Sequence, residues 1–398
     1  MLRSAGCGGR TAAGRDDDGT MIKTFIHCHP FDLLPGGSEA VLDLIHGELG
    51  ANGLSVWLGH GATTRIRPPL LTERVLRTEG GLFFRPDAAA FEATRLKPLP
   101  SKDAPASDWL GPLHEKCRER EMMLRGKISC GHLGRVAERH PDMACKNAFG
   151  MPSHSGLCLV NPDVRAFCVA LVRELSRRSI FDSLVLGDTC FHWAEAWDLV
   201  GQASLPMGEV ERVALSMCFC ESCLQAAGDA GVDGAAARRS VATFIDSFLE
   251  GAPPAISLAD VVDTHAALAP WLSWRGQALS GLWAELSEAS TCDIVVALDF
   301  ELARSAFAGL AYDAVDGVMQ VFRTDDQSIP PLAPRPRRRE LGIRAYHCVG
   351  ERSAALVARL KQHVEAGFHT FHIDGDAIFS ETGRAAVRQA LRFAKRGA

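Results

Sequence analysis

The sequence predicts a closed barrel of parallel strands alternating with helices, a (β/α)8 or TIM barrel. Eight short apolar runs recur along the chain, and segments with helical periodicity separate most of them. The length of 398 residues suits one such unit, because these barrels commonly reach ~250 residues or more. The expected strands are residues 22–28, 53–58, 122–130, 180–188, 293–299, 317–323, 342–348 and 367–374.

Helices are expected where apolar residues recur with a period near 3.6. These segments are residues 39–49, 109–120, 163–178, about 239–251, 260–290, 353–366 and 382–396. Long loops, 59–108 and 131–161, follow the second and third strands, and another follows the fourth. Because loops after the strands of such a barrel meet on one face, we expect them to wall a cleft there.

Residues 1–20 are polar and glycine-rich, with an Asp-Asp-Asp cluster and no periodicity. They are expected to form a disordered N-terminal extension. Residues 21–398 are expected to fold as a single barrel domain.

Composition excludes several classes of function. A hydrophobic fraction of 47% indicates a globular protein, and no apolar run reaches the ~20 residues that a membrane span requires. The net charge is −5, and the basic run 335–339 is interpreted as a solvated loop, so no nucleic-acid partner is expected. Thirteen cysteines without a secretory leader favour a reducing cytoplasm.

A metal site is predicted where Cys218, Cys220 and Cys223 lie within six residues. This spacing lets one turn wrap a tetrahedral ion, which favours zinc over a chance group of reduced thiols. From spacing alone the fourth ligand stays open. The candidates are Cys145, Cys158, Cys190 and His192.

The order of motifs resembles that of the zinc-cluster β-galactosidases of glycoside hydrolase family 42. The motif Leu-Cys158-Leu-Val-Asn-Pro162 is followed by an acid after strand four and then by the three cysteines. The stretches 83–87 and 271–275 also fit bacterial barrels grouped with the glycoside hydrolases. The resemblance covers about residues 80–300. It implies that Cys158 is the fourth thiolate and that the zinc is structural.

This chain departs from the family pattern at both catalytic positions. The family has an Asn-Glu pair at the end of strand four and a nucleophilic glutamate at the end of strand seven. Here strand four ends with Gly187-Asp188-Thr189, and strand seven is expected to end near His347. The family's chemistry therefore does not transfer directly.

Glycoside hydrolysis requires two carboxylates across the scissile bond. Asp188 after strand four and Glu301 after strand five form the preferred catalytic pair, with Asp299 as a further candidate. Alternatively, Asp188 and Asp299 only cap the ends of their strands.

A carbohydrate or sugar-like substrate is expected to bind among aromatic and polar side chains near the strand ends, because sugar rings stack on aromatics and hydroxyls need hydrogen-bond partners. The expected binding residues are His27, His29, Trp57, His60, Arg85, His132, His347 and Asp374. The partner is thus a small molecule or an oligosaccharide.

Two alternatives stay open. His27 and His29 could hold a metal together with Asp374, as in metal-dependent amidohydrolases, although histidines are missing after strands five and six. The barrel could also bind or remodel a sugar without hydrolysing it. The sequence does not distinguish between sugars, linkages or oligomeric states.

Overall fold

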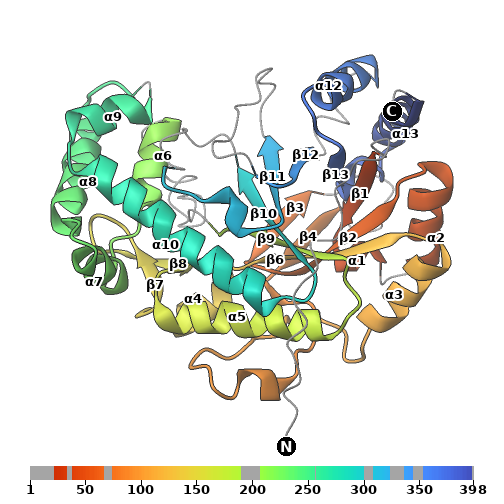
Figure 1. Cartoon of the computed structure of the whole chain (residues 1–398), viewed down its shortest axis with the longest axis horizontal. Helices are drawn as coiled ribbons and strands as arrows, with labels where there is room; N and C mark the ends of the chain where they lie inside the picture. Colours follow the sequence, from red (N-terminus) through yellow and green to blue (C-terminus); the bar gives the residue numbers. More distant parts are fainter. Residues whose placement is uncertain are drawn as a thin grey trace, which may run out of the picture.

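A computed structural model describes residues 22–33, 38–66, 74–189, 207–255, 257–299, 308–322, 336–343 and 353–396. Its centre is a closed barrel of eight parallel strands, which confirms the predicted fold class (Figure 1). The barrel closes because the first strand pairs with both the second and the last. The strands, in order around the barrel, are β1 (Lys23–Cys28), β2 (Gly53–His60), β6 (Met123–Ser129), β9 (Ser183–Gly187), β10 (Asp293–Asp299), β11 (Gly317–Phe322), β12 (Arg339–Ile343) and β13 (Thr370–Asp374).

The seventh barrel strand lies earlier in the chain than expected. It begins at Arg339, whereas the prediction placed it at 342–348, and residues 344–350 lie outside the described ranges. The prediction was wrong because Arg339 and Glu340 are charged and were read as loop. Glu340 is instead fully buried inside the barrel, where charged partners compensate it.

Helices cover the outside of the barrel. The main ones are α2 (Ser38–Asp43), continued by a π-helical turn over Leu44–Glu48, then α3 (Leu110–Glu119), α5 (Pro162–Arg177), α8 (Gly234–Leu249), α9 (Leu258–Thr264), α10 (Leu268–Ala289), α12 (Ser353–Glu365) and α13 (Glu381–Arg396). Shorter helices that the sequence did not predict are α1 (Pro30–Leu33), α4 (Gly134–Arg139), α6 (Glu209–Ser216) and α7 (Glu221–Asp229).

Local sequence explains where two of these helices begin. The side chain of Asn161 caps α5 by accepting hydrogen bonds from the N–H groups of Asp163 and Val164, and Pro162 occupies the first turn. The expected helix over 260–290 is divided into α9 and α10. Pro270 lies in the first turn of α10, where a proline is tolerated, whereas a continuous helix would place it in the interior.

Additional strands form part of the long loops. A hairpin of β3 (Thr63–Ile66) and β4 (Val75–Thr78) follows β2, and β5 (Gly81–Leu82) then pairs antiparallel with the end of β2. A second hairpin, β7 (Ala144–Lys146) and β8 (Pro152–Leu157), precedes α5.

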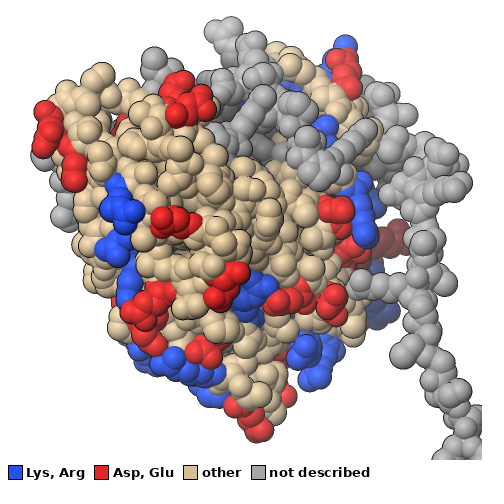
Figure 2. All heavy atoms as spheres, turned by 60° about the vertical axis from the view of Figure 1, so that its left-hand side comes forward, with Lys and Arg blue, Asp and Glu red and all other residues tan. Residues whose placement is uncertain are grey.

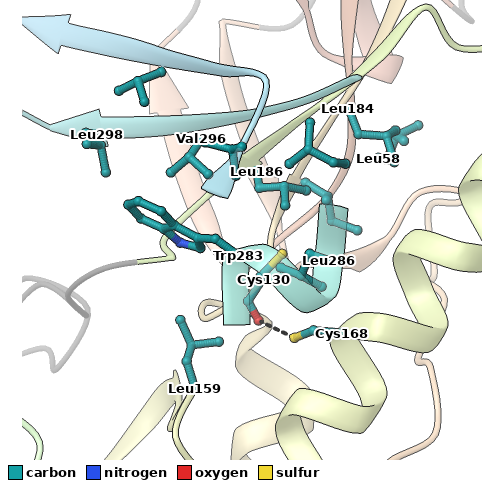
Figure 3. Close-up of a cluster of buried hydrophobic side chains, with 14 of the residues drawn as sticks. Leu58, Cys130, Leu159, Cys168, Leu184, Leu186, Trp283, Leu286, Val296 and Leu298 are labelled. Carbon is teal, nitrogen blue, oxygen red and sulfur yellow. Dashed lines mark hydrogen bonds between the residues drawn. The ribbon is translucent and has the colours of Figure 1, made fainter. Parts of the chain in front are cut away.

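The main core lies between the barrel and its helices. Trp283 and Leu286 of α10 face Leu186 and Val296 on the outer surface of the strands (Figure 3). Nearby, the thiol of Cys168 on α5 lies 4.0 Å from the carbonyl oxygen of Cys130. Cys168 is therefore a small core residue.

Basic and acidic side chains are interspersed among the coloured residues on the face of the molecule in Figure 2. The described residues on that face therefore form no extended surface of one sign. None of the helices in the described ranges is long and apolar enough to cross a membrane.

Candidate active site and cysteine cluster

A cavity of about 330 Å³ opens at the carboxyl ends of the barrel strands. Residues from β1, β2, β6, β11, β12 and β13 line it, together with Asp188 after β9 and the β3 strand of the hairpin. The expected site residues that line it are His27, Trp57, His60, His132, Asp188 and Asp374. The barrel thus brings six of the predicted side chains to one cavity.

Asp188 follows the last residue of β9 in a left-handed conformation, with φ of 52°. This conformation is uncommon outside glycine, and aspartate tolerates it better than most residues. The backbone of Gly131 lies so close that a Cβ there would collide with the carbonyl oxygen of Asp188. The close packing holds the strained turn and directs Asp188 to the cavity wall.

Asp374 ends β13 and pairs with Arg65 of the β3–β4 hairpin. The guanidinium lies 3.5 Å from Asp374 Oδ1 and also contacts Asp376 directly. Asp374 Oδ1 additionally accepts a hydrogen bond of 3.4 Å from the N–H of Asp376. Sequence reasoning missed Arg65, because no local pattern indicates a partner 309 residues away.

The ring of Trp57 contacts both Lys127 and His27. The Lys127 ammonium is 4.3 Å from its centroid, and the His27 ring meets it edge-on at 5.0 Å. His27 Nδ1 lies 3.1 Å from Ser55 Oγ. Burial, followed by the charges of Lys127 and Arg65, holds the pKa of His27 well below its usual value, so this imidazole is neutral at neutral pH.

His29 was expected at the cavity, but it is buried in contact with His60 and is not among the residues that line the cavity. Its Nδ1 accepts a hydrogen bond of 3.4 Å from the N–H of Phe31, and its Nε2 lies 2.9 Å from His60 Nε2. Because His60 Nδ1–H donates to the carbonyl oxygen of Gly61 at 2.6 Å, His60 Nε2 is the acceptor and His29 Nε2–H the donor. Both nitrogens of His29 are therefore engaged, which leaves neither to hold a metal.

His132 reaches the cavity by lying against the backbone of Gly61. A Cβ at that position would collide with the His132 ring. The glycine therefore makes room for a side chain that comes from the loop after β6.

Metal-ligating side chains in the described ranges converge at one place, the four cysteines predicted from the sequence. Ligand atoms of Cys158, Cys218, Cys220 and Cys223 lie within 4.8 Å of one another, and all four side chains are buried. His27, His29 and Asp374 form no such group among the described residues. This arrangement argues against the amidohydrolase alternative.

The sulfur positions suit a tetrahedral ion. Cys158 Sγ lies 3.4 Å from both Cys220 Sγ and Cys223 Sγ, too far for a disulfide and near the ~3.8 Å edge that zinc–sulfur bonds of ~2.3 Å require. The N–H of Lys146 points to Cys218 Sγ at 3.4 Å. This buried cluster of four cysteines could hold a metal ion.

The cluster connects two parts of the loop region. Cys158 follows the end of β8, while Cys220 occupies the N-cap position of α7 and Cys223 lies in the first turn of that helix. A fifth thiol, Cys145, lies beside the cluster; hydrogen bonds from Cys145, Cys220 and Cys223 lower the pKa of Cys158 to about 5. The same group of hydrogen bonds raises the pKa of Cys145, Cys220 and Cys223, because these neighbouring thiols share protons.

A charged network inside the barrel was not predicted. Arg125 of β6 and His372 of β13 both contact the carboxylate of Glu340 on β12, at 2.7 and 2.6 Å. Burial opposes ionisation of Glu340, yet Arg125, His372 and Arg338 hold its pKa well below its usual range. The network was missed because its members lie far apart in sequence and strand seven was misplaced.

Several predicted residues are not part of the described cavity. Arg85 is exposed, and its carbonyl oxygen accepts a hydrogen bond of 2.9 Å from Arg178 at the end of α5. Because α5 leads into the amino end of β9, Arg85 lies at the other end of the barrel, and its expected place at the cavity was wrong. Glu301 and His347 lie outside the described residues, as does the side chain of Asp299.

No protein-family model matches this chain, and no curated protein matches it. The fold is similar to three solved structures of sugar-cleaving proteins. The glycoside hydrolase domain of PgaB (BpsB) from Bordetella bronchiseptica aligns with a TM-score of 0.54 and 10% identity, over 93% of this chain and 99% of that one. The catalytic domain of a β-amylase from Paenibacillus polymyxa gives a TM-score of 0.54 and 10% identity, over 93% and 98%.

A β-galactosidase from the psychrophilic Marinomonas ef1 aligns with a TM-score of 0.51 and 13% identity, over 94% of this chain. This chain spans only 59% of that protein's length. At such low identities the likeness establishes the fold and not the reaction. The barrel architecture is thus one that known glycoside hydrolases use.

Proposed function

We propose that this protein is a glycoside-hydrolase-like enzyme that acts on a carbohydrate or sugar-like substrate in the cavity. The observation that carries the proposal is Asp188, held by a left-handed turn at the wall of a cavity above the strand ends. Among the described residues none hydrogen-bonds its carboxylate, which leaves that group accessible to a ligand. The shared fold of several glycoside hydrolases is consistent with this function.

The reaction needs two carboxylates, one to protonate the leaving oxygen and one to act as nucleophile or base. We assign these roles to Asp188 and Glu301, the pair chosen from the sequence. Asp374 is also at the cavity, but its ion pair with Arg65 suits it to orienting substrate hydroxyls. His27, His60 and His132 are further hydroxyl partners, and the face of Trp57 is a surface for a sugar ring.

Activity of the full chain against a panel of aryl glycosides and oligosaccharides tests the proposal. We expect Asp188→Asn and Glu301→Gln each to lower turnover by roughly 10²–10⁴-fold without changing the unfolding transition. Asp263→Asn, an exposed carboxylate on α9, is the matched control and should leave turnover unchanged.

Full activity in either cavity variant would remove that residue from the mechanism. If the wild type binds glycosides and cleaves none of them, the non-hydrolytic alternative replaces the enzyme.

We further propose that the ion held by the cysteine cluster is a structural zinc. Four thiolates fill a tetrahedral shell and leave no position for substrate, so the ion would join the segment after β8 to α7 and take no part in the reaction. Reduced thiols at all described cysteines suit a reducing compartment, and we propose the cytoplasm.

Elemental analysis combined with thermal unfolding tests the zinc proposal. Cys220→Ser should lose stoichiometric zinc and unfold at a lower temperature, because one fewer thiolate weakens the metal bond and the fold together. Cys292→Ser, outside the cluster, should retain both properties. A Cys220→Ser protein with full zinc and an unchanged transition would contradict the proposal.

A further inference from the structure

The cysteine cluster and the candidate active site are neighbours. A small cavity of about 20 Å³ lies between them, and Asp188 lines both this cavity and the larger one at the strand ends. Cys158, Cys218 and Cys223 of the cluster also line the small cavity. The metal site and the carboxylate proposed for catalysis therefore border one common space.

A backbone connection runs from the cluster to the loop after β6. β8 ends at Leu157, immediately before Cys158. The N–H of Leu157 donates a hydrogen bond of 2.9 Å to the carbonyl oxygen of Gly131. The neighbouring residues, His132 and Gly156, form an antiparallel bridge. The loop after β6 is thus attached to the strand that leads into a cysteine of the cluster.

Both residues of this loop position a group at the larger cavity. Gly131 packs so closely on Asp188 that a Cβ there would collide with the carbonyl oxygen of Asp188. Asp188 has a left-handed conformation, with φ of 52°, and such conformations persist only where the surrounding packing fixes them. His132 lines the cavity itself. The placement of both cavity residues therefore depends on where this loop lies.

The other end of the connection lies at the metal ligands. Two weak contacts join the β7–β8 hairpin to the segment before α7: the carbonyl oxygen of Lys146 accepts a hydrogen bond of 2.7 Å from the N–H of Phe219, and the N–H of Lys146 points to Cys218 Sγ. Cysteines bound to a structural zinc are held far more firmly, because the metal bonds contribute to the folding free energy. Metal binding would thus fix Cys158, and β8 with it, against α7.

We propose that the metal-loaded cysteine cluster is a positioning device for the active site. Fixing Cys158 holds β8, and β8 holds the loop that places Asp188 and His132. Leu157 and Gly131 make the connection. The proposal rests on the proposed function and on the proposed zinc, and it gives the cluster a part in shaping the cavity without a part in the chemistry.

Hydrogen exchange of the full chain tests the connection without any sugar. Zinc-loaded protein is compared with protein from which a chelator has removed the zinc under reducing conditions, so that no disulfide forms. The amide of Leu157 should exchange roughly tenfold faster or more without zinc, because its hydrogen bond to Gly131 opens more often. The amides of β13, opposite β9 in the barrel, are the internal control and should be unchanged.

Unchanged exchange at Leu157 would overturn the inference. Equal acceleration in β13 would also contradict it, because the metal would then hold the whole barrel rather than one loop. Neither outcome depends on whether any variant folds.

The contact between Gly131 and Asp188 is tested with methyl β-galactopyranoside and methyl β-glucopyranoside as probes. Gly131→Ala should retain its zinc and bind the probes about tenfold more weakly, a loss similar to that of one hydrogen bond, because the added Cβ displaces Asp188. Zinc-free wild type should show a similar weakening. Gly228→Ala on α7 is the matched control: an added Cβ there meets no other described residue within 4 Å, so zinc content and affinity should be unchanged.

Equal affinity of the zinc-free and zinc-loaded wild type for the probes would overturn this inference and leave the proposed function standing. If the zinc-loaded wild type binds neither probe, sugar binding in the cavity fails, and the positioning role at the active site fails with it. The exchange measurement then still shows whether the metal holds the loop.

Discussion

The two halves of the barrel interior differ in chemistry. Toward β9, β10 and β11 the interior is apolar, with Val185, Val295 and Met319 buried against one another. Toward β12, β13, β1 and β6 it contains the charged network of Arg125, Glu340 and His372, stacked on Phe25. The same barrel thus has a packed wall on one side and ionisable groups on the other.

The difference indicates where the cavity obtains its polar contacts. Removing charges from water is costly, and a buried ion pair is often no more stabilising than a well-packed apolar pair. The buried charges are therefore not expected to add more to the free energy of unfolding than apolar side chains in the same positions would. His372 belongs to this network and also lines the cavity, so the network connects the interior of the barrel to the site.

Removing the central carboxylate should have the largest effect on stability. Glu340→Met removes the carboxylate that pairs with the buried guanidinium of Arg125 and should lower the free energy of unfolding by about 3–5 kcal/mol. Adding Arg125→Met should recover most of this loss, because the uncompensated charge is gone. Denaturant unfolding of the two single variants and the double variant measures the coupling, and additive losses would contradict a dependence between the two charges.

Shortening a side chain in the apolar half should lower the free energy of unfolding by less than Glu340→Met does. No second substitution should recover that loss, because no charge is left unpaired. Met319→Ala removes buried methylene groups and should lower the free energy of unfolding by about 2–3 kcal/mol. Since no charge changes, the loss should be the same at neutral and mildly acidic pH. Unfolding curves at both pH values check this, and a strongly pH-dependent loss would show that the two halves are not independent.

Mild acid should destabilise the protein through the polar half. Burial is the main cause that lowers the pKa of both His60 and His372 to about 4, whereas an unfolded histidine titrates near ~6.5. Between these values the unfolded chain binds more protons, so stability is present above ~6.5 and is lost as the pH falls toward ~4. Each histidine adds a slope of up to about 1.4 kcal/mol per pH unit.

His372→Phe should reduce this slope by the contribution of one histidine, as measured by unfolding curves across the same pH range. An unchanged slope would show that His372 is already protonated in the fold or does not titrate in this window. His363→Phe does not serve as a control here, because burial also lowers the pKa of His363 to about 4.

Local sequence patterns predicted much of the architecture. Apolar runs located all eight barrel strands, and only β12 was displaced, by its charged first residues. Six predicted side chains line one cavity because the strands of a parallel barrel end on a common face. The cysteine spacing and the motif around Cys158 likewise anticipated a cluster that the fold brings together.

Contacts between distant segments depended on the tertiary structure. Arg65 reaches Asp374 across 309 residues, and Arg125 reaches Glu340 across 215. The sequence shows only which residues are charged, and a charge in a short segment usually marks a solvated loop. Closing the barrel buries Arg125 and Glu340 beside one another, and the neighbouring positive charges then hold the pKa of Glu340 well below its usual range although burial opposes its ionisation.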